Sequence, residues 1–338
     1  MNHSDVKILG VGSPLVDVLV MVDDEFLKKH VSGDKGGMEL VDITVIENIL
    51  KHVKSHLSEA SGGSAANTIL AMASLGVPSG FLGKLGKDRR GKFFIDAYRN
   101  VGCSVDRFKF SETHNTGTCL SLITPDSQRT MRTYLGAASS ITEDDISKED
   151  FKGYTHLHIE GYMIHNKSVI TKVLKLAKEQ NLIISIDLAS FEIVRDNLDF
   201  IRDLIDKYVD IVFANEEESV AFTGFNEPEK LLDTLSNKCS VIAVKLGKKG
   251  AIIKSNGLIS KIEAKLVDAI DTTGAGDLWQ AGFLYGYIPV KKLSGKLLEK
   301  AGGFAALLGA EVVQVTGATI PEHRWPVIRS ILEKEINE

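Results

Sequence analysis

Short apolar runs rich in Val, Ile and Leu alternate with amphipathic helical patterns along most of the chain. The runs occupy residues 6–12, 79–86, 155–162, 182–189, 209–216 and 241–247. Helical patterns between them include residues 63–76, 168–181 and 197–210. Strands of this kind, separated by helices, predict a mostly parallel sheet covered by helices on both faces. The expected fold class is therefore α/β, with ligands bound beyond the carboxyl ends of the strands.

Two segments depart from this alternation. Residues 14–26, "PLVDVLVMVDDEF", follow the first run with no helix between them. Residues 116–137 read as a β-hairpin whose turn is "TPDSQ". Both alternate in the manner of strands, so we expect them to form a small accessory sheet beside the main one. Because the chain shows no low-complexity linker and no convincing repeat, residues 1–338 are expected to form a single domain with this appendage.

Composition excludes several classes of protein. The 40 basic and 45 acidic residues are spread along the chain, with a formal charge of −5, so no basic nucleic-acid face is expected. The three cysteines are far apart and fit neither a disulfide framework nor a CxxC metal site. The N-terminus lacks the pattern of a signal peptide, and no apolar run approaches the roughly 20 residues that span a bilayer. We therefore expect a cytoplasmic protein that binds neither membranes nor nucleic acids.

The segment "DTTGAGD", residues 271–277, begins as a turn and continues as a helix. Gly274, Ala275 and Gly276 have almost no side chain, so they leave several N–H groups bare at the helix start, which suits an anion. Asp277 places a carboxylate in the same turn. The helix dipole alone explains an acid there, but it does not explain the three small residues before it. A carboxylate inside an anion site is electrostatically unfavourable, and such arrangements indicate function.

A second glycine-rich stretch, "SGGSAANT", covers residues 61–68 and precedes an apolar helix. Ser64 could simply be the N-cap of that helix. That explanation needs one glycine at most, whereas the stretch contains Gly62 and Gly63. A ligand lying against bare backbone, with Asn67 hydrogen-bonding to it, accounts for the whole set.

Two further polar positions follow strand-like runs. Asp17, among alternating apolar residues, is either a turn cap or a group that binds a hydroxyl. "NEEE", residues 215–218, is explained either by an N-cap at Asn215 with acids in the first turn or by a hydrated magnesium ion held by Asn215 and Glu218. The chain lacks essential positions of the dinucleotide fingerprint, of the Walker A loop and of the metalloprotease histidine pattern.

In this order the motifs resemble those of the ribokinase family, also called the PfkB carbohydrate kinases. "GGSAAN" followed by "GKLGKDRRG" resembles the family's N-terminal pattern, "NEEE" its N-x-x-E element, and "DTTGAGD" its C-terminal pattern. The resemblance covers nearly the whole chain. Residues 10–27 and 116–126 are most similar to the adenosine kinases of the family.

The resemblance implies a three-layer α/β/α sandwich with a β-sheet lid made by residues near 14–42 and 117–136. It implies that Asp277 is the base that accepts a proton from the primary hydroxyl of the substrate. It also implies that the N–H groups of Gly274, Ala275 and Gly276 form the anion hole for the transferring γ-phosphoryl group.

The same resemblance implies further site residues and the cofactors ATP and Mg²⁺. The positions matched to the ribose hydroxyls are Asp17, Gly63 and Asn67, and Ser64 is expected to bind the substrate with them. Asn215 and Glu218 match the magnesium and phosphate element, and Gly247 matches the loop beside the nucleotide. Arg129 matches a lid arginine that approaches the phosphates, although Arg132 lies close enough in sequence to compete for that role. Asp271 and Thr273 occupy positions that help to bind potassium in some members.

The substrate is less constrained. Glu160 matches a sugar-contacting glutamate of ribokinases, whereas Tyr162 matches an aromatic residue that stacks on adenine. We expect an adenosine-like nucleoside as substrate, with a ribose- or fructose-like sugar as the alternative. A non-catalytic binding relative is disfavoured by the intact Asp277 and glycine turn. The expected partners are small molecules, with the chain a monomer or a homodimer formed through the lid.

Overall fold

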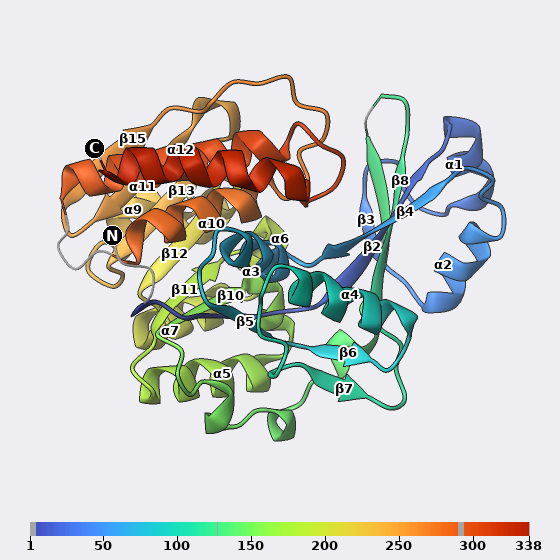
Figure 1. Cartoon of the computed structure of the whole chain (residues 1–338), viewed down its shortest axis with the longest axis horizontal. Helices are drawn as coiled ribbons and strands as arrows, with labels where there is room; N and C mark the ends of the chain where they lie inside the picture. Colours follow the sequence, from blue (N-terminus) through green and yellow to red (C-terminus); the bar gives the residue numbers. More distant parts are fainter. Residues whose placement is uncertain (1–4, 127, 290–293, 338) are drawn as a thin grey trace.

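The computed structural model describes residues 5–126, 128–289 and 294–337, and its main element is an eight-stranded sheet (Figure 1). The first two strands in the spatial order given next form an antiparallel hairpin at one edge, and the other six strands are parallel to one another. In spatial order the strands are β15 (Leu258–Ile262), β14 (Ala251–Ser255), β13 (Val241–Lys245), β12 (Ile211–Asn215), β11 (Ile183–Asp187), β10 (His156–Glu160), β1 (Ile8–Val11) and β5 (Ser79–Leu82). All six expected apolar runs contribute strands to it, which confirms the mostly parallel sheet.

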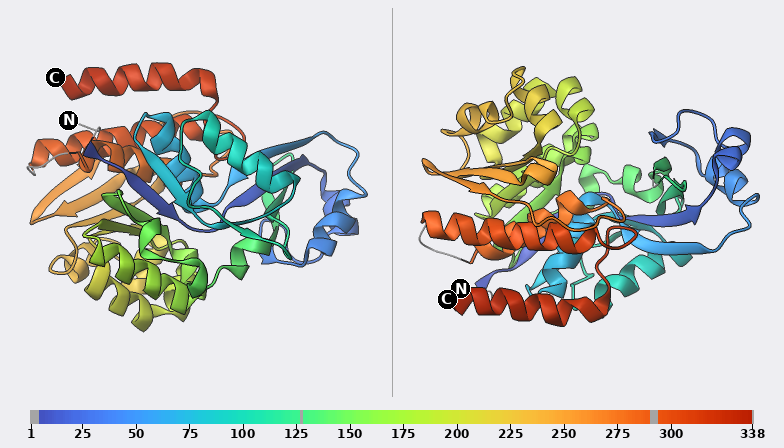
Figure 2. Two further views of the ribbon diagram at one scale, coloured as in Figure 1. Left: turned by 60° about the horizontal axis from the view of Figure 1, so that its bottom comes forward. Right: turned by 90° about the horizontal axis from the view of Figure 1, so that it is seen from above.

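Helices cover both faces of this sheet, so the three-layer α/β/α sandwich is confirmed (Figure 2). Successive residues of a strand point to opposite faces, so Ile8 belongs to one core and Leu9 to the other. The first core includes α3 (Ser64–Ser74), α4 (Arg89–Asn100), α10 (Ala275–Tyr287), α11 (Gly295–Val312) and α12 (Trp325–Asn337). The second includes α5 (Lys167–Glu179), α6 (Phe191–Asp196), α7 (Leu198–Tyr208), α8 (Glu216–Thr223) and α9 (Lys230–Leu235).

A second sheet of five strands extends away from the sandwich, on the right of Figure 1. Its spatial order is β3 (Met38–Leu40), β9 (Arg129–Tyr134), β8 (Gly117–Ile123), β2 (Leu15–Met21) and β4 (Leu57–Gly62). Strands β8 and β9 form the expected hairpin, and Ser127 of its expected turn lies outside the described residues. One face packs on α1 (Asp24–His30) and α2 (Ile43–Leu50). A small parallel pair, β6 (Lys84–Gly86) and β7 (Lys109–Ser111), completes the strands described.

Strand β4 lies outside the segments near 14–42 and 117–136 that were expected to build this sheet. Its sequence, "LSEASG", has no apolar alternation, and four of its six residues are exposed or half-buried. The strand is recruited by pairing with β2, where Leu57 to Gly62 run antiparallel to Val20 to Leu15. Long-range pairing of this kind leaves no local hydrophobic signal.

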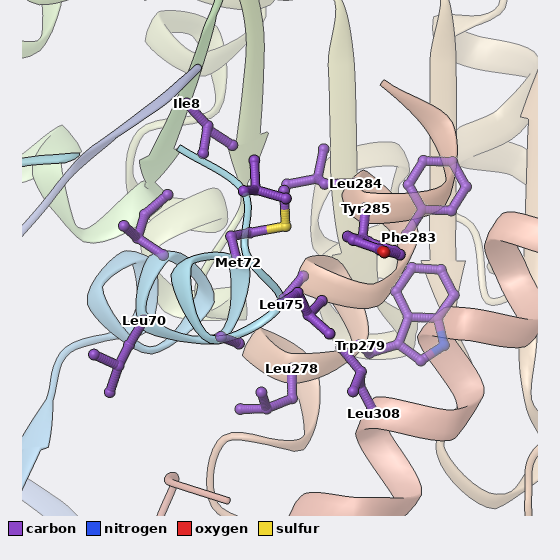
Figure 3. Close-up of a cluster of buried hydrophobic side chains, with 14 of the residues drawn as sticks. Ile8, Leu70, Met72, Leu75, Leu278, Trp279, Phe283, Leu284, Tyr285 and Leu308 are labelled. Atoms are coloured by element: carbon purple, nitrogen blue, oxygen red, sulfur yellow. The ribbon is translucent and has the colours of Figure 1, made fainter. Parts of the chain in front are cut away.

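Helices α3 and α10 pack against each other and thereby fix the positions of their N-termini. Figure 3 shows Leu70 and Met72 of α3 and its C-cap residue Leu75 close to Leu278 and Leu284 of α10. All of these side chains are at least nine-tenths buried. Close packing of this kind transmits small changes in volume, so the two helix starts are held in a defined relation.

Two expectations from composition can be compared with this fold. Cys103, Cys119 and Cys239 are all buried and free, so no disulfide joins them. Throughout the part of the chain that the structure describes, no helix combines the length and apolarity needed to cross a membrane.

Candidate active site

Helix α10 begins at a backbone position that only glycine occupies easily. Gly274 is its N-cap, with φ +73°, and no side chain caps the helix. A Cβ at Gly274 would lie 2.6 Å from the Cβ of Ala318. Both the left-handed conformation and this contact exclude a larger residue.

The first turn of α10 presents N–H groups of which two lack an acceptor in the part of the chain that the structure describes. Ala275 N–H donates to the carbonyl of Thr272 at 3.2 Å. Within the described residues, the N–H groups of Gly274 and Gly276 have no acceptor. The expected bare turn is therefore present, although one of its three N–H groups is taken internally.

The carboxylate of Asp277 is held between this turn and the start of α3. Ser64 Oγ donates to its Oδ1 at 2.8 Å, and Asn67 Nδ2 donates to its Oδ2 at 2.9 Å. Thr68 Oγ1 also donates to the main-chain oxygen of Asp277 at 3.1 Å. Burial raises the pKa of Asp277 to about 6, and the hydrogen bonds from Asn67 and Ser64 hold it lower than burial alone would.

The interpretation of Ser64 as an N-cap is wrong. The N-cap of α3 is Gly63, with φ +104°, and Ser64 is already inside the helix. A Cβ at Gly63 would lie 2.3 Å from the carbonyl oxygen of Ser13, so a close approach of two backbones requires this glycine. From inside the helix, the Ser64 hydroxyl is used to bond to Asp277.

Asp17 faces the same region from the second sheet. It lies within β2 and not at its end, so it caps no turn, and that alternative is wrong. Gly62 gives it room, since a Cβ there would lie 2.5 Å from the Asp17 carboxylate. Burial raises the pKa of Asp17 to about 7, Arg129 counteracts this, and Asp277 and Asp271 raise the pKa further.

Glu160 lies at the carboxyl end of β10, beneath the start of α3. It is 1% exposed, and its oxygens accept hydrogen bonds from Ser13 N–H at 2.8 Å and Ala65 N–H at 3.0 Å. Burial raises the pKa of Glu160 to about 7. Tyr162, two residues further on, is 39% exposed and available to a ligand.

Asn215 and Glu218 bond to each other in a capping box. Asn215 N–H and Nδ2 donate to the Glu218 carboxylate at 2.8 and 2.7 Å, and Glu218 N–H donates to Asn215 Oδ1 at 2.8 Å. The structure therefore shows Asn215 as the N-cap with an acid in the first turn, which was the alternative to a magnesium site. Burial raises the pKa of Glu218 to about 7, as does the nearby Asp187, and Lys245 lowers it.

The oxygens of Asn215 and Glu218 fit a magnesium ion that keeps several of its water ligands. No group of three or more His, Cys, Asp or Glu side chains that could hold a metal ion occurs within residues 5–126, 128–289 and 294–337. Mg²⁺ commonly keeps several waters and takes one or two carboxylates together with substrate phosphates. The single buried carboxylate of Glu218, beside Asn215, fits an ion of that kind.

Lys245, Asp187 and Gln280 complete the site, and our sequence analysis did not identify them. Lys245 ends β13, and its Nζ lies 3.3 and 3.5 Å from the two oxygens of Asp187, which ends β11. Gln280 Nε2 donates to Asp187 at 2.5 Å. A charged residue that closes a buried run, as in "IISID" and "VIAVK", is the signal that could have found both. Gly247, φ +55°, follows Lys245 at the same edge.

The two lid arginines point to opposite faces of the second sheet. Arg129 forms an ion pair with Asp271, at the start of the glycine turn. Arg132 is fully buried on the other face, where it bonds to the carbonyl of Ser32 and pairs with Glu39 at 3.3 Å. Side chains alternate along a strand, so residues three apart cannot share a face. Arg129 is thus the arginine placed near the turn.

Asp271 has three partners in this arrangement, and the potassium site stays a prediction. Its Oδ1 accepts Thr273 N–H at 3.0 Å, and its Oδ2 accepts Gly317 N–H at 2.6 Å and pairs with Arg129. A guanidinium already balances this carboxylate. Thr273 contributes its backbone to the turn.

Comparison with known proteins identifies relatives along most of the chain. Residues 37–325 match the model of the pfkB family carbohydrate kinase. Adenosine kinase 2 of Arabidopsis thaliana is 26% identical, with 95% of this chain and 97% of that protein covered. Ribokinase of the same plant is 28% identical, with coverages of 81% and 71%. The crystal structure of adenosine kinase from Sinorhizobium meliloti is 27% identical and superposes with a TM-score of 0.84, covering 98% of this chain and 99% of that one.

Proposed function

The chain belongs to the pfkB family of carbohydrate kinases, which are phosphotransferases acting on hydroxyl groups, and we propose that its acceptor is the primary hydroxyl of an adenosine-like nucleoside. ATP supplies the phosphoryl group, and Mg²⁺ supplies positive charge to its phosphates. The protein's own contribution is to position the acceptor hydroxyl, remove its proton and stabilise negative charge.

Asp277 is the group placed to remove that proton. With a pKa of about 6 it is mostly ionised at pH 7, yet it is a stronger base than an ordinary aspartate. Ser64 and Asn67 fix its orientation through one hydrogen bond to each oxygen. Each oxygen retains a lone pair for the hydroxyl, because a carboxylate accepts about four hydrogen bonds.

The glycine turn is placed to receive negative charge. The N–H groups of Gly274 and Gly276 lack acceptors among the described residues, and they lie at the positive end of the α10 dipole. Base and anion hole belong to one helix start, so the hydroxyl and the phosphoryl group meet there in a fixed relation. Asn215 and Glu218 would hold a hydrated magnesium ion against the phosphates.

The face of the second sheet supports the nucleoside as substrate. Strand register places Asp17 opposite Cys119, Cys119 opposite Thr133, and Thr133 opposite Leu40, so one row crosses four strands on one face. Leu40 is 58% exposed although it shares this row with the half-buried carboxylate of Asp17, which we propose binds a hydroxyl. An exposed apolar group in the row of Asp17 suits an acceptor that joins hydroxyl groups to a flat apolar base, and this observation carries the substrate assignment.

A sugar kinase acting on ribose, fructose or a related carbohydrate is the alternative, because the relatives include ribokinase and 5-dehydro-2-deoxygluconokinase. Glu160 was the residue expected to favour a sugar. Both of its oxygens accept backbone N–H groups in the structure, so a direct bond to a sugar would have to share them.

A coupled ADP-release assay over nucleosides and free sugars, at saturating Mg²⁺ and ATP, tests the proposal. We expect adenosine to give the highest kcat/KM. Turnover of sugars without turnover of any nucleoside would contradict the nucleoside assignment and support the sugar kinase.

A further inference from the structure

A buried ion pair lies directly beneath the glycine turn. The side chains of Lys245 and Asp187 are 15% and 7% exposed, and Gln280 is fully buried. Gln280 comes from α10 itself, three residues after Asp277, and donates to the Asp187 carboxylate. Strands β11 and β13 and helix α10 therefore meet at one carboxylate.

The ammonium group of Lys245 is close to the turn and has unused donors. A Cβ built on Gly276 would lie 3.2 Å from Lys245 Nζ, so the absence of a side chain at Gly276 leaves the ammonium uncovered. Asp187 is its one hydrogen-bonding partner within the described part of the chain, through two long contacts. An ammonium has three N–H donors, so at least one remains for an anion at the turn.

We propose that Asp187 and Gln280 are positioning residues that hold the Lys245 ammonium beneath the glycine turn, where it balances negative charge on the transferring phosphoryl group. This inference rests on the proposed function, and it adds a cation to the N–H groups of Gly274 and Gly276. Asp187 fixes the position of the ammonium, and Gln280 fixes the Asp187 carboxylate.

A purely structural role explains these contacts less well. Burying an ion pair costs desolvation energy that the pair repays only with close geometry and satisfied hydrogen bonds. Here the contacts between Lys245 and Asp187 are 3.3 and 3.5 Å, and Gln280 Oε1 has no hydrogen-bond partner. An anion-binding site needs a buried cation that is only loosely paired. An ion pair that stabilises the fold needs close contacts instead.

Asp187 and Lys245 also act on the pKa of Asp277, in opposite directions. Asp187 raises the pKa of the Asp277 carboxyl, and Lys245 lowers it. The other titratable groups that interact with this site are Asp17, His158, Glu160, Tyr162 and Glu218, with Arg129 and Asp271 beside Asp17. Removing one member of the pair should therefore shift the titration of Asp277 in a direction that identifies which member was removed.

The test uses Asp187→Asn, Lys245→Met and Gln280→Met, each close in size to the parent residue. Asp233→Asn is the matched control. Asp233 lies on the protein surface and pairs at 2.9 Å with Lys254 of β14, the strand next to the one that carries Lys245. The first measurement is a ¹³C-NMR titration of carboxyl-labelled aspartate in ligand-free protein, with the Asp277 signal assigned by its loss in Asp277→Asn.

We expect the Asp277 pKa to fall in Asp187→Asn and to rise in Lys245→Met, with no change in Asp233→Asn. We also expect kcat to fall by about 10²- to 10³-fold in Lys245→Met, as for removal of one group that stabilises transition-state charge. Asp187→Asn and Gln280→Met should lower kcat less, with the KM of the acceptor unchanged.

The inference would be overturned if the Asp277 titration curves of Asp187→Asn and Lys245→Met both superimposed on that of the parent. A parental kcat in Lys245→Met would overturn it too. If the parent itself phosphorylates no acceptor, the proposed function fails. The NMR titration still decides whether Asp187 and Lys245 act on Asp277.

Discussion

The side-chain amide of Asn67 donates to Oδ2 of Asp277 at 2.9 Å, so the first turn of α3 holds a carboxylate in the first turn of α10. These residues are 210 positions apart in the sequence. The two helices are locked by packing of their apolar faces, and the carboxylate at their joint start has a defined orientation.

Asp277→Asn should abolish most turnover and leave the fold intact. Asparagine keeps the size and remains acceptable at a helix start, but it cannot accept the proton of the attacking hydroxyl. General-base assistance is typically worth about 10²- to 10⁴-fold, and the loss should appear in kcat with little change in ligand binding by calorimetry. A folded variant that kept more than about a tenth of the parental kcat would show that Asp277 is not the base.

The acid limb of kcat/KM should have an apparent pKa near 6. The reaction needs the ionised Asp277, whose pKa is about 6, so activity is lost as the pH falls through that value. Initial rates between pH 5 and 8 at constant ionic strength measure this, after an assay of stability at each pH. A limb that stayed near the ordinary aspartate pKa of about 4 would contradict it.

Arg129→Gln should mainly lower activity, and Arg132→Gln should mainly lower stability. Arg129 pairs with Asp271 beside the glycine turn, so its loss should lower kcat/KM by on the order of tenfold or more, about 1.4 kcal/mol, with a small change in Tm. Arg132 is fully buried away from the turn, and its loss should mainly lower Tm. The reverse pattern, by kinetics and calorimetry, would assign the phosphate-side role to Arg132.

Tyr162→Ala should penalise a nucleoside more than a free sugar. The ring is 39% exposed near Glu160, and aromatic contacts of this kind are worth on the order of 1 kcal/mol, or about fivefold in kcat/KM. Competition between adenosine and ribose in one assay measures the ratio directly. An equal loss for both acceptors would exclude base stacking by Tyr162.

Glu218→Gln should raise the Mg²⁺ concentration needed for half-maximal activity and leave nucleoside binding nearly unchanged. Glutamine can complete the capping box with Asn215, so α8 should still form. The variant loses only the charge that attracts a hydrated cation. Identical activity against Mg²⁺ concentration in variant and parent would return Glu218 to a purely capping role.

The same variant has a separate effect on stability. The folded pKa of Glu218 is about 7, above its ordinary value of 4.5, so its contribution to stability is complete below pH 4.5 and is lost as the pH rises through 7. Replacement by uncharged glutamine should therefore flatten the fall in Tm between pH 4.5 and 7. The Asp233→Asn variant, changed on the surface, should keep the parental slope.

The sequence predicted the parts of this site whose chemistry lies in one short segment. The bare turn of residues 274–276 and the acid after it were visible because three small residues adjoin one carboxylate. The choice between Arg129 and Arg132 was open, although strand alternation already places them on opposite faces. The contact of Arg129 with Asp271, by contrast, depends on how the second sheet lies on the first.

The residues that were missed depend on pairing across the sheet. Asp187 and Lys245 are 58 positions apart and meet because strands β11 and β13 both end at the same edge. Each looks ordinary in its own segment. Strand β4 was missed for a similar reason, since its polar sequence becomes a strand only against β2.

The contact between Gly274 and Ala318 ties the beginning of α10 to a segment near the end of the chain. Gly317 N–H donates to Asp271, and Ile270 N–H donates to the carbonyl of Val313. The glycine turn therefore takes its shape only after almost the whole polypeptide has left the ribosome, although Asp17 and Asn67 are made early. A chain interrupted before residue 313 would carry every side chain of the site and still lack the backbone that shapes it, so incomplete products of translation should consume no ATP.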